Sequence, residues 1–312
     1  MFWVLIFLIP ACLAGLNWYG WVMIERRHPA RGKFLSVEGG RLHYIDKGQG
    51  DPLILLHGAS ANGQDFDASI LPALAKHYRV IVPDRLGMGH SLRVGRHWHT
   101  PLDQANTVRE LITHLGLDKP VLVAHSWSGA LALAYLLYYP REISSVVLLS
   151  PAAHTWHAPA ALYNRLTRWP LIGQLFTWLM VFPLGYLGLD TGIRSVFHRG
   201  KVPAGYRRRT AIDLLLRPRS WRANADDLCL LNRYLASQGR CYGWIRHPIL
   251  SIIGDYDTVV SNEIHTMTLK RQLHSLSVVS LAECGHAPHH EHPEVVCKLI
   301  RDFIESLGPT NS

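Results

Sequence analysis

The chain has 312 residues, of which 48% are hydrophobic, and its 32 Lys and Arg against 23 Asp and Glu give a net charge of +9. This length and composition suit one large hydrophobic core with an inserted segment, and the chain contains no internal repeats or low-complexity tracts. Its five cysteines are scattered and odd in number, unlike a disulfide framework or a zinc motif. The basic residues fall in two segments without a recognised nucleic-acid fold, so no nucleic acid partner is predicted.

The N-terminal segment is apolar. Residues 1–24 contain no charged side chain, and Asn17 is the only strongly polar one. At about 1.5 Å per residue, a helix of this length would cross the hydrocarbon core of a bilayer. Trp18, Tyr19 and Trp21 lie near its end, as aromatic anchors at a membrane interface do.

A cleaved signal peptide is the alternative for this segment, because residues 11–14 offer a small-residue cleavage site; the protein would then be secreted or periplasmic. No positive charge precedes the apolar run, however, and Arg26, Arg27 and Arg31 follow it. By the positive-inside rule these charges stay in the cytoplasm. We therefore predict a single-pass transmembrane helix at residues 1–24, a basic juxtamembrane linker at 25–35 and a cytoplasmic remainder.

Beyond the linker, short apolar runs alternate with helical patterns. This alternation predicts a mostly parallel sheet covered by helices on both faces, with a ligand site beyond the carboxyl ends of the strands. Strands are expected at residues 41–46, 53–56, 80–84, 121–125, 146–149, 248–253 and 277–281, and helices at 71–77, 107–115, 128–138 and 263–273.

The most informative of these runs ends at Ser126. The residues two before and two after it, Ala124 and Ser128, are small, and Gly129 follows. A serine at a sharp strand-to-helix turn has strained backbone geometry that only small neighbours accommodate, and nucleophiles for covalent catalysis are mounted in this way. Because the usual consensus has glycines at the two outer positions, an ordinary helix N-cap serine is the alternative for this motif alone.

Two further segments carry matching chemistry. The run 52–56 breaks into the glycine loop His57-Gly58-Ala59, and the backbone amides of Ala59 and Trp127 are predicted to form an oxyanion hole. The run 248–253 ends in a loop with two carboxylates, Asp255 and Asp257, one of which is expected to orient a histidine. The candidate histidine is His286, in the loop after the last predicted strand.

In the order of Ser126, Asp257 and His286 along the chain, and in its motifs, the chain resembles the α/β-hydrolase superfamily over residues 36–307. The motifs are His57-Gly58, the segment Asp84-Arg85-Leu86-Gly87-Met88-Gly89-His90-Ser91, the elbow Ala124 to Gly129, the acid loop Gly254-Asp255-Tyr256-Asp257, and Gly285-His286-Ala287-Pro288. The resemblance implies an α/β-hydrolase fold with a helical cap inserted after strand 6. It divides the chain into core (36–150), cap (151–246) and core (247–312).

The resemblance also places the acid at Asp257. It implies a catalytic triad in which His286 removes the proton of Ser126 and Asp257 orients the imidazole, with no metal and no organic cofactor. Haloalkane dehalogenases and epoxide hydrolases resemble the chain in loops and cap, but they need an aspartate where Ser126 stands. A serine leaves esters, thioesters, lactones, certain amides and C–C bonds beside a carbonyl as substrates.

The remaining histidines have simpler interpretations. His125 is expected to be a packing or pocket residue, and His57 to brace the oxyanion loop. The cluster of His286, His289, His290 and His292 admits a metal site, but no cysteine pair or carboxylate spacing supports one.

The cap segment is apolar in its first half and rich in arginine in its second. It either buries both faces or admits a lipid-like acyl chain and docks on anionic membrane lipids. We therefore expect a membrane-anchored, lipase-like serine esterase acting on small hydrophobic esters such as acylglycerols. The alternatives are an amidase or peptidase like the proline iminopeptidases, a C–C bond hydrolase, and a non-catalytic ligand-binding protein on the same fold.

Overall fold

The computed structural model describes residues 2–95 and 97–308, with side chains from residue 8 onward. Its centre is a sheet of nine strands within that part of the chain, in the order β1-β2-β4-β3-β6-β7-β8-β9, with β5 paired to β2. The strands are β1 (Lys33–Val37), β2 (Gly40–Lys47), β3 (Pro52–Leu56), β4 (Arg79–Pro83), β5 (Leu92–Arg93), β6 (Val121–His125), β7 (Val146–Leu149), β8 (Ile249–Gly254) and β9 (Leu276–Leu281). β2 is antiparallel to β1, β4 and β5, and the pairs from β4 through β9 are parallel, so the predicted mostly parallel sheet is confirmed.

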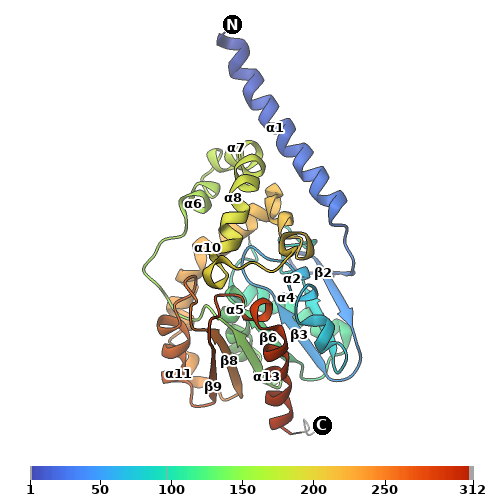
Figure 1. The fold of residues 1–312 in the computed structure, drawn as a ribbon, viewed down its shortest axis with the longest axis vertical. Helices are drawn as coiled ribbons and strands as arrows, with labels where there is room; N and C mark the ends of the chain where they lie inside the picture. Colours follow the sequence, from blue (N-terminus) through green and yellow to red (C-terminus); the bar gives the residue numbers. More distant parts are fainter. Residues whose placement is uncertain (1, 96, 309–312) are drawn as a thin grey trace.

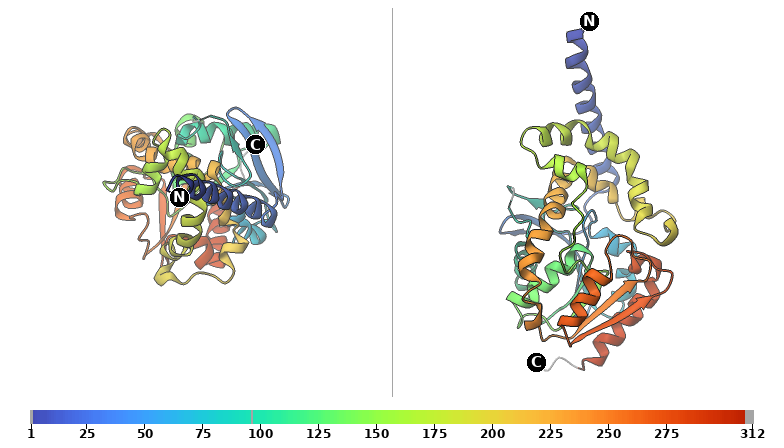
Figure 2. Two further views of the ribbon diagram at one scale, coloured as in Figure 1. Left: turned by 90° about the horizontal axis from the view of Figure 1, so that it is seen from above. Right: turned by 90° about the vertical axis from the view of Figure 1, so that its left-hand side faces the viewer.

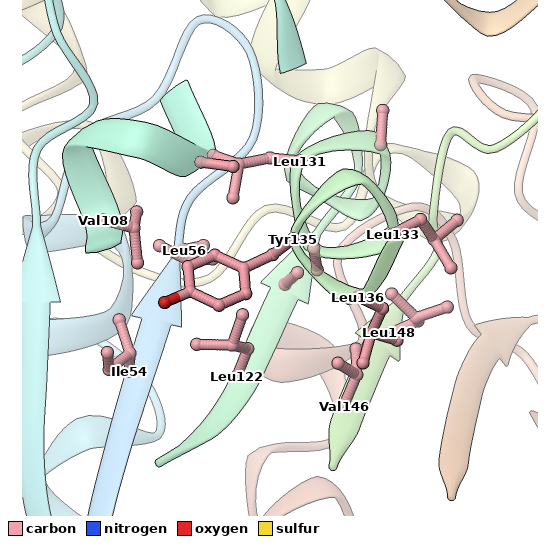
Figure 3. Close-up of a cluster of buried hydrophobic side chains, with 14 of the residues drawn as sticks. Ile54, Leu56, Val108, Leu122, Leu131, Leu133, Tyr135, Leu136, Val146 and Leu148 are labelled. Carbon is pink, nitrogen blue, oxygen red and sulfur yellow. The ribbon is translucent and has the colours of Figure 1, made fainter. Parts of the chain in front are cut away.

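Helices cover both faces of this sheet. Those of the core are α2 (Gln64–Asp67), α3 (Leu71–Leu74), α4 (Pro101–Leu115), α5 (Trp127–Tyr138), the π-helical turn η4 (Glu263–Met267), α11 (Thr268–Gln272), α12 (Pro288–Glu291) and α13 (Pro293–Ser306). Ile54 and Leu56 of β3 and Leu122 of β6 pack against α4 and α5, as Figure 3 shows. Alternate residues of the same strands pack against α3 and α13 on the opposite face. Burial on both faces explains why these strands are continuously apolar.

Helix α4 begins earlier than predicted, at Pro101 rather than at residue 107. Thr100 accepts a hydrogen bond from the backbone of Asp103 at 2.9 Å, and the Asp103 carboxylate accepts one from the backbone of Thr100 at 3.2 Å. This reciprocal capping box, with proline at the first helical position, fixes the start of the helix. The prediction missed it because it followed the apolar periodicity and not the capping residues.

The helices between β7 and β8 form a cap over the carboxyl ends of the strands. It comprises α6 (Leu162–Thr167), α7 (Ile172–Leu179), α8 (Val181–Ser195), η1 (His198–Gly200), α9 (Tyr206–Arg209), η2 (Ile212–Leu216), α10 (Pro218–Gln238) and η3 (Tyr242–Trp244). The insertion follows β7, the sixth strand when the two-residue β5 is not counted. In Figures 1 and 2 the cap lies between the sheet and the projecting part of α1 (Phe2–Arg27).

Helix α1 projects from the body at its N-terminal end, and its C-terminal half contacts α7, α8 and η2 (Figure 1). Across residues 8–95 and 97–308, no single helix is long and apolar enough to cross a membrane. The pair α7 and α8, which meet at an angle of 70°, meets that criterion when taken together. The membrane anchor at residues 1–24 stays a prediction.

Candidate active site

Ser126 lies at the turn between β6 and α5, with φ of 53° and ψ of −117°. For a residue other than glycine this geometry is strained by about 1–3 kcal/mol, and the surrounding backbone must hold it. The Ser126 amide donates to the carbonyl of Leu149, and its own carbonyl accepts from Gly129 and Ala152, all at 2.9 Å. A Cβ on Gly129 would come within 2.6 Å of Pro151, which explains the small residue there.

The three residues predicted for catalysis meet at the carboxyl edge of the sheet. The Ser126 hydroxyl lies 2.9 Å from Nε2 of His286, whose Nδ1 lies 2.8 Å from a carboxylate oxygen of Asp257. The second oxygen of Asp257 accepts from the amides of Val259 and Val260, both at 2.9 Å. Such a chain of hydrogen bonds can move the serine proton to the imidazole while the carboxylate fixes its tautomer.

Of the two carboxylates in the acid loop, only Asp257 contacts His286. Burial alone would raise the pKa of Asp257, but the His286 charge and the hydrogen bonds from His286 and the loop amides outweigh it and hold the pKa below its usual value. Asp257 is therefore ionised at neutral pH. Asp255 instead accepts a hydrogen bond from the amide of Cys284 at 3.2 Å and holds the histidine loop.

The two predicted oxyanion residues lie at the same cavity as the serine. Ala59 and Trp127 both line the same cavity as Ser126. In the described part of the chain, neither amide donates a hydrogen bond to a protein acceptor. Trp127 is the first residue of α5, where an amide has no intrahelical partner. Unpaired donors beside a nucleophile are suited to receive a developing negative charge.

His57 connects the glycine loop to neighbouring segments. Its Nδ1 donates to the carbonyl of Gly58 at 2.8 Å, and its Nε2 accepts from the amide of Arg85 at 2.9 Å. Its carbonyl accepts from the Ser128 hydroxyl at 2.5 Å, which ties the loop to α5. This arrangement agrees with the predicted bracing role.

The prediction missed Asp227, a fully buried carboxylate on α10. It pairs with the guanidinium groups of Arg85 at 2.6 Å and Arg93 at 2.7 Å. Arg85 also donates to the carbonyls of His57 and Gly58, both at 3.2 Å, and lies 4.1 Å from the ring centre of Trp127. The network joins the cap to both halves of the predicted oxyanion hole. The sequence signal was an acidic pair, residues 226–227, in an otherwise arginine-rich segment.

Asp84 organises the loop after β4. Its carboxylate accepts from the amides of Gly63 at 2.6 Å and His90 at 2.7 Å and from Nδ1 of His43 at 2.8 Å. Burial opposes ionisation, but these hydrogen bonds and the His43 charge lower the pKa of Asp84 to about 2. Gly89 has φ of 48°, and a Cβ there would overlap the Asp84 carboxylate. The Asp84 motif therefore has a structural role: it holds the loop after β4 in place beside the site.

Behind His286 lies a second buried group of histidines. His289 and His290 each donate from Nε2 to one oxygen of Asp65, both at 2.8 Å. Asp65, His289 and His290 are the one trio within the described residues whose geometry suits a metal ion, but the candidate ligand atoms already pair with one another. His125 donates to the carbonyl of His286 at 2.9 Å, so it packs against the histidine loop as expected.

A cavity of about 1240 Å³ extends from Ser126 into the cap. This exceeds the roughly 300–1,000 Å³ of typical ligand pockets. His286 and the predicted oxyanion residues lie at its floor, and its far wall comes mainly from apolar residues of α7, α8 and the corner between them. Six of these are Phe176, Met180, Val181, Leu184, Leu189 and Ile193.

The buried histidines predict a loss of stability in mild acid. Burial and the Arg85 charge lower the pKa of His57 to about 4, and burial with the neighbouring His154 does the same for His265. An unfolded chain binds these protons near pH 6.5, so the stabilisation is complete above pH 6.5 and is lost as the pH falls towards 4. Each pKa unit corresponds to about 1.4 kcal/mol per group, and urea unfolding at pH 7.5, 5.5 and 4.5 measures the sum.

A His265→Asn variant tests the cause of that loss. His265 accepts from the amides of Ala153 and His154 through Nδ1 at 3.2 and 3.1 Å, and an asparagine oxygen can replace that acceptor without titrating. The variant should show a shallower decline in stability between pH 6.5 and 4 than the natural protein. An equally steep decline in the variant would show that protonation of His265 does not contribute to the loss of stability. A stability of the natural protein that does not change with pH would contradict the prediction for the buried histidines as a whole.

Comparisons with known proteins agree with this arrangement. A profile of the Alpha/beta hydrolase family matches residues 53–299. A soluble epoxide hydrolase of Corynebacterium sp. (strain C12) is 38% identical over 110 residues, but the match spans only 34% of this chain and 36% of that protein. A 2-hydroxymuconate semialdehyde hydrolase of Pseudomonas putida is 23% identical over 92% of this chain and 99% of its own length.

Solved structures give the same fold. The crystal structure of Cfl2 from Burkholderia cenocepacia superposes with a TM-score of 0.74 at 20% identity, over 87% of this chain and 94% of that one. A mostly parallel sheet with a serine turn, an acid loop and a histidine loop at its carboxyl edge defines a class of hydrolases built on one scaffold. The chain belongs to the Alpha/beta hydrolase family.

Proposed function

We propose that the protein is a serine hydrolase that cleaves hydrophobic carboxylic esters through an acyl-enzyme. The observation that carries this proposal is the hydrogen-bonded chain of Ser126, His286 and Asp257 at the floor of a large cavity with a mainly apolar far wall. Ester hydrolysis through an acyl-enzyme needs a nucleophile, a general base and hydrogen-bond donors that stabilise the oxyanion. The apolar wall of the cavity favours an apolar acyl chain.

In the proposed mechanism, the Ser126 oxygen attacks the ester carbonyl as its proton passes to Nε2 of His286. The amides of Ala59 and Trp127 then stabilise the oxyanion. His286 returns the proton to the departing alcohol oxygen, which leaves an acyl group on Ser126. A water molecule, deprotonated by His286, attacks that acyl group and releases the acid, and the proton returns to Ser126. Asp257 stays ionised throughout and stabilises the charged imidazole.

C–C bond hydrolysis beside a ketone is the second candidate. The supporting observation is the match to the 2-hydroxymuconate semialdehyde hydrolase along nearly its whole length. A peptidase that binds a substrate amine would need an unpaired carboxylate in the cavity. Of the three carboxylates that line the cavity, Asp65 is engaged by His289 and His290 and Asp257 by His286, whereas Asp255 accepts one hydrogen bond, from the amide of Cys284. Among the described residues, the cap contributes no carboxylate to the cavity lining, so the ester and C–C candidates are preferred.

The proposal includes attachment to a membrane through α1, with the hydrolase domain on the cytoplasmic side and lipids as partners. At about 1.5 Å per residue, its 26 residues span roughly 39 Å; the part from Asn17 onward carries the contacts with the cap, and the part before it projects from the body (Figure 1). Arg26 and Arg27 end the helix. Exposed apolar side chains lie on α1 and on the cap beside it, and they include Leu16, Trp18, Tyr19, Leu171, Leu175 and Leu187. Release of the protein from membranes by alkaline carbonate would contradict the anchor.

A substrate series distinguishes the candidates. We expect kcat/KM for p-nitrophenyl esters, measured in detergent, to rise from acetate to dodecanoate because each buried CH₂ contributes about 0.8 kcal/mol, or roughly fourfold. A 2-hydroxy-6-oxo-dienoate tests the C–C candidate, and a prolyl p-nitroanilide tests the peptidase. Turnover of the dienoate alone would replace the ester proposal, and a preference for acetate would contradict the acyl-binding role of the cavity.

A further inference from the structure

We propose that α1 is part of the substrate-binding apparatus, with Asn17 as a positioning residue that fixes the corner between α7 and α8 and thereby sets acyl-chain selectivity. The proposal rests on the ester hydrolysis inferred above. Asn17 is the only strongly polar residue among the first 24, and its side chain is only 1% exposed. A buried side-chain amide on an otherwise apolar helix needs hydrogen-bond partners, and the two partners of Asn17 lie in the cap.

The partners of Asn17 lie on the two sides of the corner. Its side-chain nitrogen donates to the carbonyl of Thr177 on α7 at 3.4 Å, and its oxygen accepts from the amide of Phe182 on α8 at 3.0 Å. The bend between α7 and α8 deprives the last carbonyls of α7 and the first amides of α8 of intrahelical partners. One side chain from α1 thus supplies a donor and an acceptor to the break.

The contact extends along one face of α1. Positions 17, 20, 21 and 24 follow the spacing i, i+3, i+4 and i+7, which places them on one face of a helix. A Cβ on Gly20 would overlap the Phe182 ring, the rings of Trp21 and Trp178 meet edge to face at 6.2 Å, and Ile24 is buried against α8 and η2. Neighbouring Trp18 points away and is 60% exposed.

The corner is also a wall of the substrate cavity. Phe176 of α7, Met180 at the corner and Val181 of α8 all line it. The other end of the α8 segment is held by the core, because the His286 amide donates to the carbonyl of Val196 at 2.8 Å and the His198 amide donates to Glu291 at 2.9 Å. Loss of Asn17 would loosen the wall near α1 and leave the histidine loop held. Selectivity for long chains should therefore change without a matching loss of chemistry.

The test uses the full chain in detergent with p-nitrophenyl butyrate and dodecanoate. In Asn17→Leu, kcat/KM for dodecanoate should fall about tenfold, mainly through KM, as expected when a buried hydrogen-bonding group is removed. The values for butyrate should stay within about twofold, because the reacting groups do not move. Trp18→Leu is the matched control on the exposed face of α1, and Asn17→Ala replaces the leucine variant if that variant does not fold.

Hydrogen exchange provides a readout that does not depend on activity. The amide of Phe182 and its neighbours at the corner should exchange faster in Asn17→Leu than in the natural protein or in Trp18→Leu, whereas β6 and β7 should stay protected. Equal losses for both esters, unchanged selectivity, or unchanged exchange at the corner would each overturn the proposal. If the natural protein cleaves neither ester, the proposed function and the selectivity role fail together, while the exchange result alone still decides whether Asn17 holds the corner.

Discussion

Replacement of Ser126 by alanine is expected to lower kcat for the preferred ester by about 10⁴- to 10⁶-fold. The hydroxyl that would attack the carbonyl, 2.9 Å from His286, is removed, and only binding and the oxyanion amides remain to stabilise the transition state. The loss should appear in kcat more than in KM, because the apolar cavity wall is untouched. A fluorophosphonate that labels the natural protein should not label the variant.

The control for Ser126→Ala is Ser277→Ala on the exposed face of β9, which should keep full activity. Both variants should unfold at the temperature of the natural protein within a few degrees, since each loses one oxygen atom. More than a few per cent of residual turnover in a folded Ser126→Ala protein would mean that another group is the nucleophile, or that ester cleavage occurs without a covalent intermediate.

The sequence allowed the reacting residues to be predicted because each follows a predicted strand in a local motif. The parallel strands β6, β8 and β9 end at one edge of the sheet, so the loops after them bring Ser126, Asp257 and His286 together whatever lies between. The choice of Asp257 over Asp255 needed the family resemblance. Residue spacing alone left both carboxylates open.

The residues that the prediction missed act through contacts between distant parts of the chain. Asp65 meets His289 and His290 across more than 220 positions, and Asp227 meets Arg85 across 142. The sequence shows that Asn17 is polar but not that its partners are backbone groups about 160 residues away. Such pairings depend on how the cap sits on the core, which no local period or motif encodes.

The largest expected effect on stability comes from Asp227. Its side chain is fully buried and satisfies two guanidinium groups that are themselves almost inaccessible, those of Arg85 and Arg93. Asp227→Ala would leave two buried cations without a counter-charge. Removal of one partner of a buried ion pair typically costs about 3–5 kcal/mol, because the remaining charge has been taken out of water. Urea unfolding in detergent at neutral pH should show a loss of this size.

Asp190→Ala is the matched control, because Asp190 also pairs with an arginine of the cap, Arg207 at 3.1 Å, but its side chain is 65% exposed. Its loss should lower the free energy of unfolding by no more than about 1 kcal/mol. Asp227→Ala should in addition reduce kcat in whatever fraction stays folded, since Arg85 holds the carbonyls of His57 and Gly58 beside the predicted oxyanion amide of Ala59. Equal destabilisation by the two variants would show that the Asp227 network is no stronger than a surface pair. The cap would then be held on the core chiefly by its apolar contacts.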